Sequence, residues 1–308
     1  MCVSDFTEYL TAKRTVDDRA LNRRVWDRFV SELNATTQAV DRPLRIVEVG
    51  TGIGSMIGRL ADWEALSGTV SYRAVDLNES CIAAARERVP DWLTAAGYDV
   101  ESAGACEITA THAATDTRLK VSFEQADARA ITDEADAVIA AAFLDIVEVA
   151  RLLDAFRDVI RDGGFLYAPC TYDGATHFSP AHPRDDRIET LYHRHMDEIR
   201  DLPGGSRAGR TVLERAPEHG YEVVAVGGGD WVVRPKGDAL GGYPNEEGAF
   251  LDHLLTTIDG ALAEYPNEVL DPAIREEWTD VRRDQRAAGT LTLIAHHLDL
   301  LARVEPAT

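Results

Sequence analysis

The stretch Arg45-Ile-Val-Glu-Val-Gly-Thr-Gly-Ile-Gly54 decides how this chain folds. A β-branched run carries Glu48, and three glycines follow at alternate positions before an apolar helical pattern begins at Ser55. This order predicts a strand, a tight turn and a helix N-terminus, which is how a backbone comes close to a nucleotide-like ligand. The carboxylate of Glu48 would repel a pyrophosphate, but it suits a ligand that carries an ammonium group and ribose hydroxyls.

The chain beyond this turn alternates strands with helices. Two apolar runs close on the acids Asp76 and Asp127, and a later helix is expected from Glu148 to Ile160. Acids at the ends of parallel strands meet at one edge of the sheet, where a carboxylate can accept hydrogen bonds from both hydroxyls of a ribose. We therefore expect an α/β fold whose further strands are Val70–Asp76, Lys120–Asp127, Asp136–Asp145 and Asp162–Pro169.

In the order and spacing of these motifs, over residues 45 to 170, the chain resembles the class I S-adenosylmethionine-dependent methyltransferases. Glu48-Val-Gly-Thr-Gly-Ile-Gly54 is similar to motif I of that family, and Gly163-Gly164 at the start of the fifth strand is typical of it. The resemblance implies S-adenosylmethionine as the cofactor. It also implies a Rossmann-like, seven-stranded, mostly parallel sheet, closed by an antiparallel hairpin that we expect at Tyr221–Pro235, as two strands around a glycine-rich turn.

The resemblance also implies which residues hold the cofactor. Asp76 would bind the ribose and Asp127 the adenine amino group, and the N-terminal helix would offer Lys13 or Arg19 to the methionine carboxylate. An ordinary amphipathic helix with solvated charges is an equal alternative for that helix. The expected cofactor-binding residues are Lys13, Arg19, Glu48, Gly50, Thr51, Gly52, Asp76, Leu77, Asp127, Ala128, Ala142 and Phe143.

Two alternative functions stay open. The variant fingerprint Gly52-x-Gly54-x-x-x-Gly58 fits an NAD(P)-binding oxidoreductase, but no lysine follows a tyrosine at the spacing of a short-chain dehydrogenase. The other alternative is a non-catalytic, regulatory protein with a methyltransferase fold, which the intact acids and glycines of the site disfavour. The sequence contains neither a phosphate loop nor a nucleophile elbow, so hydrolysis is disfavoured too.

Composition sets further limits. The 308-residue chain has 53 acidic against 32 basic residues and a net charge of −21, which is typical of halophilic proteins in a high-salt cytoplasm. No basic stripe is present, so nucleic acid is disfavoured as a substrate. The sequence has no run of 18 apolar residues, and we expect a cytoplasmic protein without a membrane span. The four cysteines lack the spacing of a zinc site, and we expect no metal.

We expect three parts in the chain. Residues 1–40 form a helical cap, and residues 41–236 form the core, with an insertion at about 90–118 that holds a helix end and a β-hairpin. Residues 237–308 form a helical extension that covers the acceptor or forms a homodimer surface. Its helices are expected at Ala249–Glu264, Pro272–Ala288 and Leu291–Val304.

The sequence does not identify the methyl acceptor; we expect a small molecule first and a protein side chain second. A general base helps when the acceptor must lose a proton. We place this base at the end of the fourth strand, in the loop Cys170–Pro180 or in the helix that follows, and the candidates are Asp145, Asp173, His177 and His195. His296 and His297 lie in an apolar pattern, and we expect at least one of them to be a packed core residue.

Overall fold

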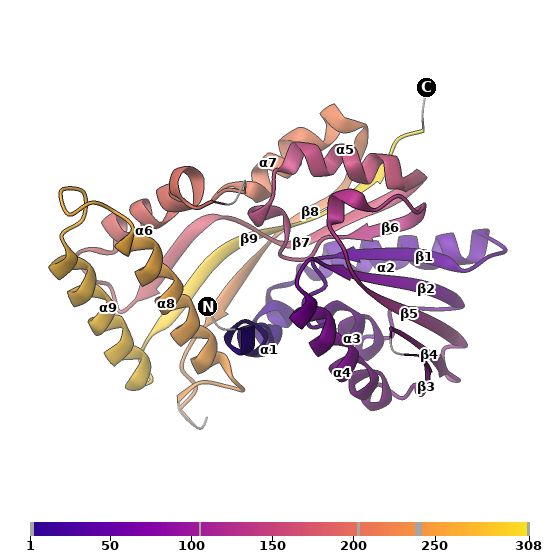
Figure 1. Ribbon diagram of the computed structural model, residues 1–308, viewed down its shortest axis with the longest axis horizontal. Helices are drawn as coiled ribbons and strands as arrows, with labels where there is room; N and C mark the ends of the chain where they lie inside the picture. Colours follow the sequence, from indigo (N-terminus) through magenta and orange to yellow (C-terminus); the bar gives the residue numbers. More distant parts are fainter. Residues whose placement is uncertain (1–2, 105, 202–203, 238–241, 307–308) are drawn as a thin grey trace.

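One β-sheet forms the middle layer of the molecule (Figure 1). The computed structural model describes residues 3–104, 106–201, 204–237 and 242–306. The strands are β1 Leu44–Val49, β2 Thr69–Asp76, β3 Asp99–Gly104, β4 Glu107–His112, β5 Thr117–Gln125, β6 Ala135–Ile139, β7 Ile160–Ser179, β8 Tyr221–Val233 and β9 Thr292–Val304. Their order across the sheet is β3-β4-β5-β2-β1-β6-β7-β9-β8.

The five central strands run parallel. β1 pairs with β2 and β6, β2 also pairs with β5, and β6 pairs with β7. In β1, Ile46 faces one hydrophobic core, while Val47 and Val49 face the other. Strands buried on both faces read as near-continuous apolar runs, which is why the sequence predicts them. The parallel arrangement brings the carboxyl ends of β1, β2, β5 and β6 to one edge of the sheet.

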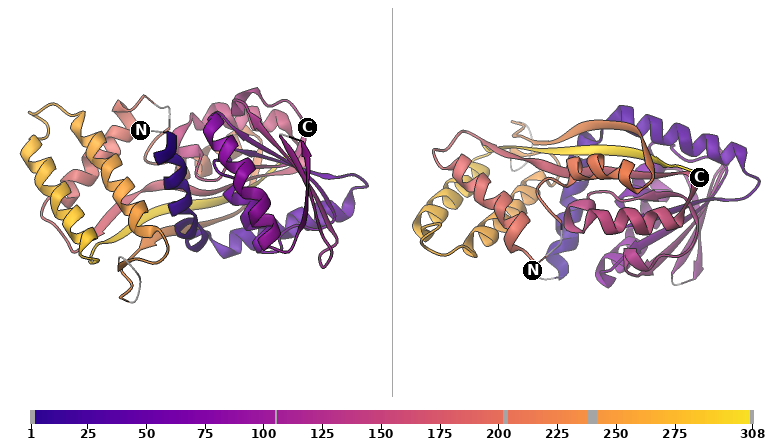
Figure 2. Two further views of the ribbon diagram at one scale, coloured as in Figure 1. Left: turned by 60° about the horizontal axis from the view of Figure 1, so that its bottom comes forward. Right: turned by 90° about the horizontal axis from the view of Figure 1, so that it is seen from above.

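Helices cover both faces of the sheet (Figure 2). They are α1 Val3–Ala20, α2 Arg23–Ala39, α3 Ser55–Asp62, α4 Glu79–Ala95, α5 Val149–Val159, α6 Asp185–Arg194, α7 Ala208–Arg215, α8 Glu247–Ala263 and α9 Pro272–Ala287. The core on one face holds side chains of α1 to α4, and the core on the other face holds side chains of α5 and α7. α1 contacts α4 on one side and α8 on the other.

The insertion after α4 extends the sheet. The predicted hairpin is confirmed: β3 and β4 pair antiparallel, and β4 pairs antiparallel with β5. Among the residues that the structure describes, the sheet therefore has nine strands where we expected seven, because the hairpin continues the sheet instead of standing apart from it.

The predicted hairpin at Tyr221–Pro235 and the predicted helix at Leu291–Val304 are both wrong. Residues Tyr221–Val233 form one strand, β8, and its antiparallel partner is β9 near the end of the chain. The glycines that suggested a turn lie inside β8. A Cβ atom on Gly229 would stand 2.2 Å from the carbonyl oxygen of Ala20, so the glycine lets the end of α1 approach the strand. An antiparallel pair does close the sheet, but β8 and β9 form it.

β7 is longer than predicted. The segment expected as the loop Cys170–Pro180 continues the strand to Ser179 and pairs with β9, with interruptions of the register after Ala168 and Tyr172. The long β7, β8 and β9 reach beyond β1, β2, β5 and β6, and α6, α8 and α9 lie beside them at the left of Figure 1. The division of the chain at residues 40 and 236 stays a prediction.

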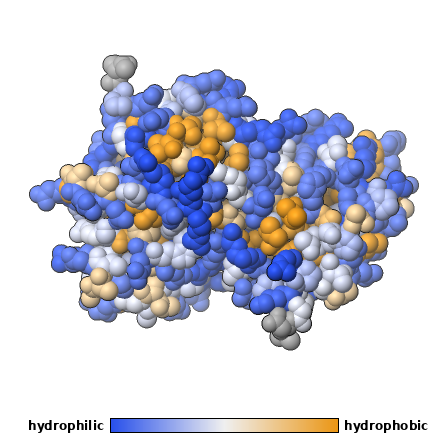
Figure 3. Space-filling view, turned by 180° about the vertical axis from the view of Figure 1, so that it is seen from behind, coloured by the Kyte–Doolittle hydropathy of each residue, from blue (hydrophilic) through white to orange (hydrophobic). Residues whose placement is uncertain are grey.

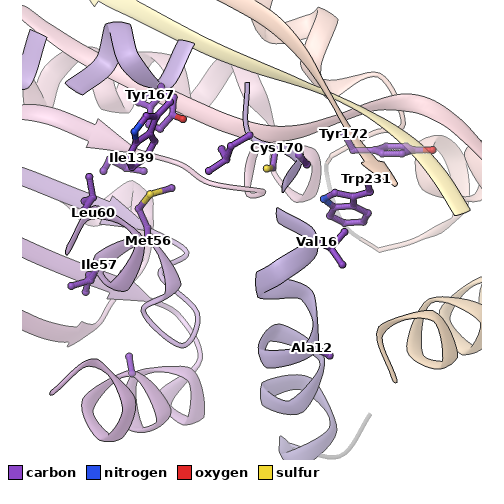
Figure 4. Close-up of a cluster of buried hydrophobic side chains, with 14 of the residues drawn as sticks. Ala12, Val16, Met56, Ile57, Leu60, Ile139, Tyr167, Cys170, Tyr172 and Trp231 are labelled. Atoms are coloured by element: carbon purple, nitrogen blue, oxygen red, sulfur yellow. The ribbon is translucent and has the colours of Figure 1, made fainter. Parts of the chain in front are cut away.

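The hydrophobic core that holds side chains of α1 to α4 also includes side chains of α6, α8 and α9. It runs from α3 through α1 to Trp231 of β8 and Phe250 of α8, and Figure 4 shows Val16 of α1 beside Trp231.

The molecule seen from behind has apolar side chains gathered in two places (Figure 3). Val232 and Ile294, which are register partners in β8 and β9, are 41% and 42% exposed. Within the described ranges, no helix combines the length and apolar character that a bilayer crossing needs.

Candidate functional site

The glycine-rich turn between β1 and α3 forms the floor of the candidate site. Gly50 has a φ of +63°, and a Cβ atom there would stand 2.4 Å from the ring of Phe143. Gly54 has a φ of +82° and precedes the first residue of α3, where a Cβ atom would stand 2.5 Å from Val89. Both positions need a left-handed backbone and leave no space for a side chain, so only glycine fits them.

A pocket of about 540 Å³ lies over this turn at the carboxyl edge of the sheet. A smaller hollow adjoins it and shares Leu10, Lys13, Gly50 and Gly52 with it. Every expected cofactor-binding residue except Arg19 lines the pocket or the hollow: Lys13, Glu48, Gly50, Thr51, Gly52, Asp76, Leu77, Asp127, Ala128, Ala142 and Phe143.

Two carboxylates lie along the larger pocket. Asp76 accepts hydrogen bonds from the backbone N–H groups of Gly52 and Asn78, each at 2.9 Å, so it also shapes the turn. Asp127 accepts from the backbone N–H of Arg129 at 2.9 Å and from its Nη2 at 2.5 Å. The side-chain hydrogen bond from Arg129 lowers the pKa of Asp127, so this carboxylate is held ionised. Each carboxylate keeps lone pairs for a ligand.

Apolar side chains stand at the mouth of the same pocket. Leu77 is 70% exposed and Ile146 is 38% exposed, and Phe143 also lines the pocket. A flat ring bound between these side chains would cover apolar surface that water now reaches.

Glu48 is buried beneath the smaller hollow. It accepts hydrogen bonds from Thr51 Oγ1 at 2.6 Å and from the Tyr72 hydroxyl at 2.9 Å. Burial raises the pKa of Glu48 to about 7, although both hydrogen bonds oppose the shift. A cation placed in the hollow would favour the ionised form.

Two cations line the smaller hollow. Lys13 Nζ lies 2.7 Å from Asp17 Oδ2 and 5.0 Å from the centre of the Trp231 ring. Arg59 is 4% exposed and donates to Asp18 from Nε at 2.7 Å, but its Nη2 is buried without a partner among the described residues. A carboxylate in the hollow would satisfy this orphaned donor. Sequence reasoning missed Arg59, and the available signal was an arginine inside the apolar pattern of α3.

Arg19, which we expected to hold the cofactor, lines neither the pocket nor the hollow. Its Nη2 lies 2.8 Å from Glu247 Oε2 of α8, its Nη1 also contacts Glu247, and Nη2 donates to the carbonyl of Val232 at 3.2 Å. Arg19 therefore joins α1 to α8 and to β8.

Three of the four candidate bases lie outside the pocket. Asp173 is buried and paired with the Arg210 side chain, and its Oδ1 accepts a hydrogen bond of 2.8 Å from the backbone N–H of Arg210 in the first turn of α7. His177 has a side chain that is 63% exposed and lies 3.5 Å from Glu189. His195 begins a single π-helical turn after α6, and its Nε2 lies 3.0 Å from Oε2 of Glu264. Asp173, His177 and His195 are thus each paired with a neighbouring side chain, which fits a role in holding the fold.

Asp145 is the remaining candidate, and it lies directly beside the pocket. Phe143 and Ile146, on either side of it in the turn after β6, both line the pocket. Its Oδ1 is buried and has no hydrogen-bond partner within the described part of the chain. Burial raises the pKa of Asp145, and the charges of Arg200 and Lys13 oppose the shift. The side chain is thus an unsatisfied acceptor beside the pocket.

The two C-terminal histidines differ from each other. His297 is buried against the Trp231 ring, with ring centres 4.1 Å apart, and burial lowers its pKa to about 3. It is the packed core histidine that we expected. His296 pairs with Asp230 at 2.7 Å near the surface. Within the described ranges, no cluster of three or more histidines, cysteines and acids could hold a metal ion.

No protein-family model and no curated protein matches the chain. Among solved structures, a candidate methyltransferase of Bacillus halodurans matches with a TM-score of 0.46 at 15% identity, covering 90% of this chain and 99% of its own. A candidate methyltransferase of Haloferax volcanii, in complex with the activator Trm112, gives 0.45 at 15% identity, with 100% and 99% covered. Magnesium protoporphyrin IX methyltransferase of Synechocystis with bound SAH gives 0.43 at 12% identity, with 92% and 82% covered. These similarities are low, so the function is inferred from the residues of the pocket.

Proposed function

We propose that this protein is an S-adenosylmethionine-dependent methyltransferase that acts on a small molecule. The observation that carries the proposal is the set of groups lining the pocket and the adjoining hollow. They are a glycine-rich turn, carboxylates at the ends of β2 and β5, a buried carboxylate in β1 and two cations. This set complements a nucleoside with an amino-acid tail, which offers ribose hydroxyls, an amino group, an ammonium and a carboxylate.

Each part of that ligand has residues suited to hold it. Asp76 would accept hydrogen bonds from the ribose and Asp127 from the adenine amino group, with Leu77 and Phe143 against the ring. In the smaller hollow, the unpartnered Nη2 of Arg59 and the ammonium of Lys13 would hold the carboxylate, and Glu48 the amino-acid ammonium.

The bound cofactor would supply a methyl group on a positively charged sulfur that leaves as a neutral thioether. The residues of this chain therefore have to orient the reactants and exclude water. Orientation of this kind can supply about 7–11 kcal/mol. α1 contributes to it because Leu10 and Lys13 lie over both parts of the pocket.

A small acceptor is supported by the size of the pocket, about 540 Å³. The net charge of −21 disfavours a nucleic acid at this site.

Ligand binding tests the proposal. In high-salt buffer, S-adenosylmethionine or its demethylated product should bind with micromolar affinity and raise the thermal midpoint, since a ligand at 100 times its Kd adds about 2.7 kcal/mol of stability. Calorimetry and thermal unfolding measure both effects. A response to NADH with none to the adenosyl ligands would contradict the proposal. Tight cofactor binding without methylation of any molecule in a cell extract would favour the non-catalytic alternative.

A further inference from the structure

Asp299 of β9 is a fully buried carboxylate with two backbone partners. Its Oδ1 accepts a hydrogen bond from the backbone N–H of Cys170 in β7, and its Oδ2 accepts one from the backbone N–H of Asn22, each at 2.8 Å. Burial raises the pKa of Asp299 to about 6, and both hydrogen bonds oppose the rise, so the side chain is ionised at neutral pH. One carboxylate thus binds two segments that are far apart in the sequence.

The first segment is a bulge in β7. The register of β7 with β9 is interrupted after Ala168, and Pro169 and Cys170 stand opposite the single residue Asp299. Cys170 has a φ of +54°, which a residue with a Cβ atom rarely adopts. A bulged residue lacks a partner in the regular ladder, and the carboxylate of Asp299 supplies that partner for the N–H of Cys170.

This bulge forms one wall of the smaller hollow. Pro169 and Cys170 both line the hollow. The carbonyl of Pro169 also accepts a hydrogen bond of 2.9 Å from the backbone N–H of Ala142, which lines the pocket as well as the hollow. The position of the bulge therefore affects the turn after β6 too.

The second segment is the corner between α1 and α2. The N–H of Leu21 donates to the carbonyl of Asp17 at 3.0 Å in the helical pattern, and the next N–H, that of Asn22, donates to Asp299. Leu21 and Asp17 line the hollow, to which α1 also brings Lys13. Figure 4 shows Cys170 beside this end of α1. The corner is therefore part of the wall that α1 forms.

Resting on the proposed function, we propose that Asp299 is a positioning residue that holds the end of α1 against the bulge of β7, and so fixes two walls of the hollow that takes the amino-acid tail of the cofactor. Asp299 lines neither the pocket nor the hollow, and each of its oxygens already has a partner, so it is not a catalytic residue. An asparagine could not replace it, because the side-chain NH₂ group would face one of the two N–H donors.

The nucleoside half of the cofactor should depend much less on Asp299. Asp76 ends β2 and Asp127 follows β5, and in the sheet β1, β6 and β7 separate these two strands from β9. Loss of the Asp299 contacts should therefore affect the tail and the nucleoside unequally.

Two adenosyl ligands that differ in the amino-acid tail test the proposal on the full chain. S-adenosylhomocysteine, the demethylated product, has the tail, and 5′-methylthioadenosine lacks it. Asp299→Asn, with Asp299→Ser as a second variant, should weaken binding of S-adenosylhomocysteine by about 10-fold or more, the change expected when one hydrogen bond to a charged group is lost. Binding of 5′-methylthioadenosine should stay close to that of the wild type. Calorimetry below the unfolding midpoint of each variant measures both affinities.

The matched control is Asp136→Asn. Asp136 is also a buried carboxylate that accepts a backbone N–H at 2.8 Å, from Arg45, but it lies near the start of β6, at the edge of the sheet opposite the pocket. This control should lower the thermal midpoint and leave both affinities unchanged. Equal weakening of the two ligands in Asp299→Asn, or unchanged binding of S-adenosylhomocysteine, would overturn the positioning role. A wild type that binds neither ligand would instead overturn the proposed function itself.

Hydrogen exchange in the wild type tests the same role without a variant, and it decides the question if the Asp299 variants do not fold. S-adenosylhomocysteine should slow exchange of the backbone N–H groups of Asn22 and Cys170 more than 5′-methylthioadenosine does, because only the tail fills the hollow between the two segments. Equal slowing by the two ligands, or no slowing at either residue, would contradict the proposal.

Discussion

Glu48 is a buried carboxyl whose pKa of about 7 lies above the ordinary 4.5. Between these values the folded state keeps a proton that the unfolded state has lost, so the free energy of unfolding without ligand should fall as pH rises from about 4.5 to 7. A bound ammonium would favour the ionised form, so cofactor affinity should rise over the same range, with proton release near pH 6. Calorimetry in buffers of different ionisation heat measures that release.

Glu48→Gln is the matched variant for this prediction. It should flatten the pH dependence of affinity and weaken binding at pH 8 by about 1.5–3 kcal/mol, the range for a hydrogen bond to a charged group. Asp299, another buried carboxyl with a pKa of about 6, titrates in both proteins and cancels in the comparison. An unchanged slope in Glu48→Gln would remove Glu48 from the cofactor site.

Most of the residues that line the pocket and the hollow could be named from the sequence because the parts of this lining are local. The glycine turn and the acids that end strands stand at fixed places relative to their own elements. Arg19 and Arg59 could not be predicted, since tertiary packing decides where a helical arginine goes. Asp18 holds Arg59 under the turn, while Glu247, far away in the sequence, holds Arg19 outside the pocket. The pairing of Asp173 with Arg210 could not be predicted for the same reason.

The contact between α1 and β8 determines how α1 lies over the pocket. Gly229→Ala would place a Cβ atom 2.2 Å from the carbonyl oxygen of Ala20, and backbone cannot move aside as a side chain can. We expect a loss of about 1–3 kcal/mol of stability and weaker cofactor binding, because Leu10 and Lys13 move with the helix. Thermal unfolding and calorimetry measure the two effects.

Gly228→Ala is the control for this prediction. A Cβ atom there would meet only the His296 side chain at 3.3 Å, on the exposed side of the strand. The control should retain stability and affinity near wild type. Equal losses in the two variants would mean that strand propensity, and not the approach of α1, explains the effect.

β9 shows why the C-terminal elements were harder to predict than the central ones. Its run Leu293-Ile-Ala-His-His-Leu-Asp-Leu300 is apolar at both helix-like and strand-like spacings. A short apolar run buried in a sheet cannot be distinguished from a buried helix by periodicity alone. The glycines of β8 led to the wrong prediction of a turn. Glycines inside a strand can allow a neighbouring backbone to approach closely, and in the sequence they look like the glycines of a turn.

At the scale of the whole molecule, α1 connects the helices packed on the parallel sheet with α8, since it contacts both α4 and α8. Arg19 makes a two-point contact with Glu247, whose side chain is fully buried and whose other partner is Thr15 at 3.1 Å. Arg19→Ala would leave a buried carboxylate without its cation, and such a change costs about 3–5 kcal/mol for a fully buried pair. We expect a loss of stability at or below the lower end of this range, because the side chain of Arg19 is itself about half exposed.

A double-mutant cycle separates the ion pair from general damage. Glu247→Gln removes the charge that Arg19 neutralises, so Arg19→Ala should cost clearly less in the Glu247→Gln background than in wild type. Urea unfolding gives the four free energies. Both single variants should also weaken cofactor binding, because α1 carries Lys13 and Leu10 into the pocket only while it stays attached to α8. Additive losses would show that the two residues act independently, and an unchanged cofactor Kd would show that the pocket does not need this attachment.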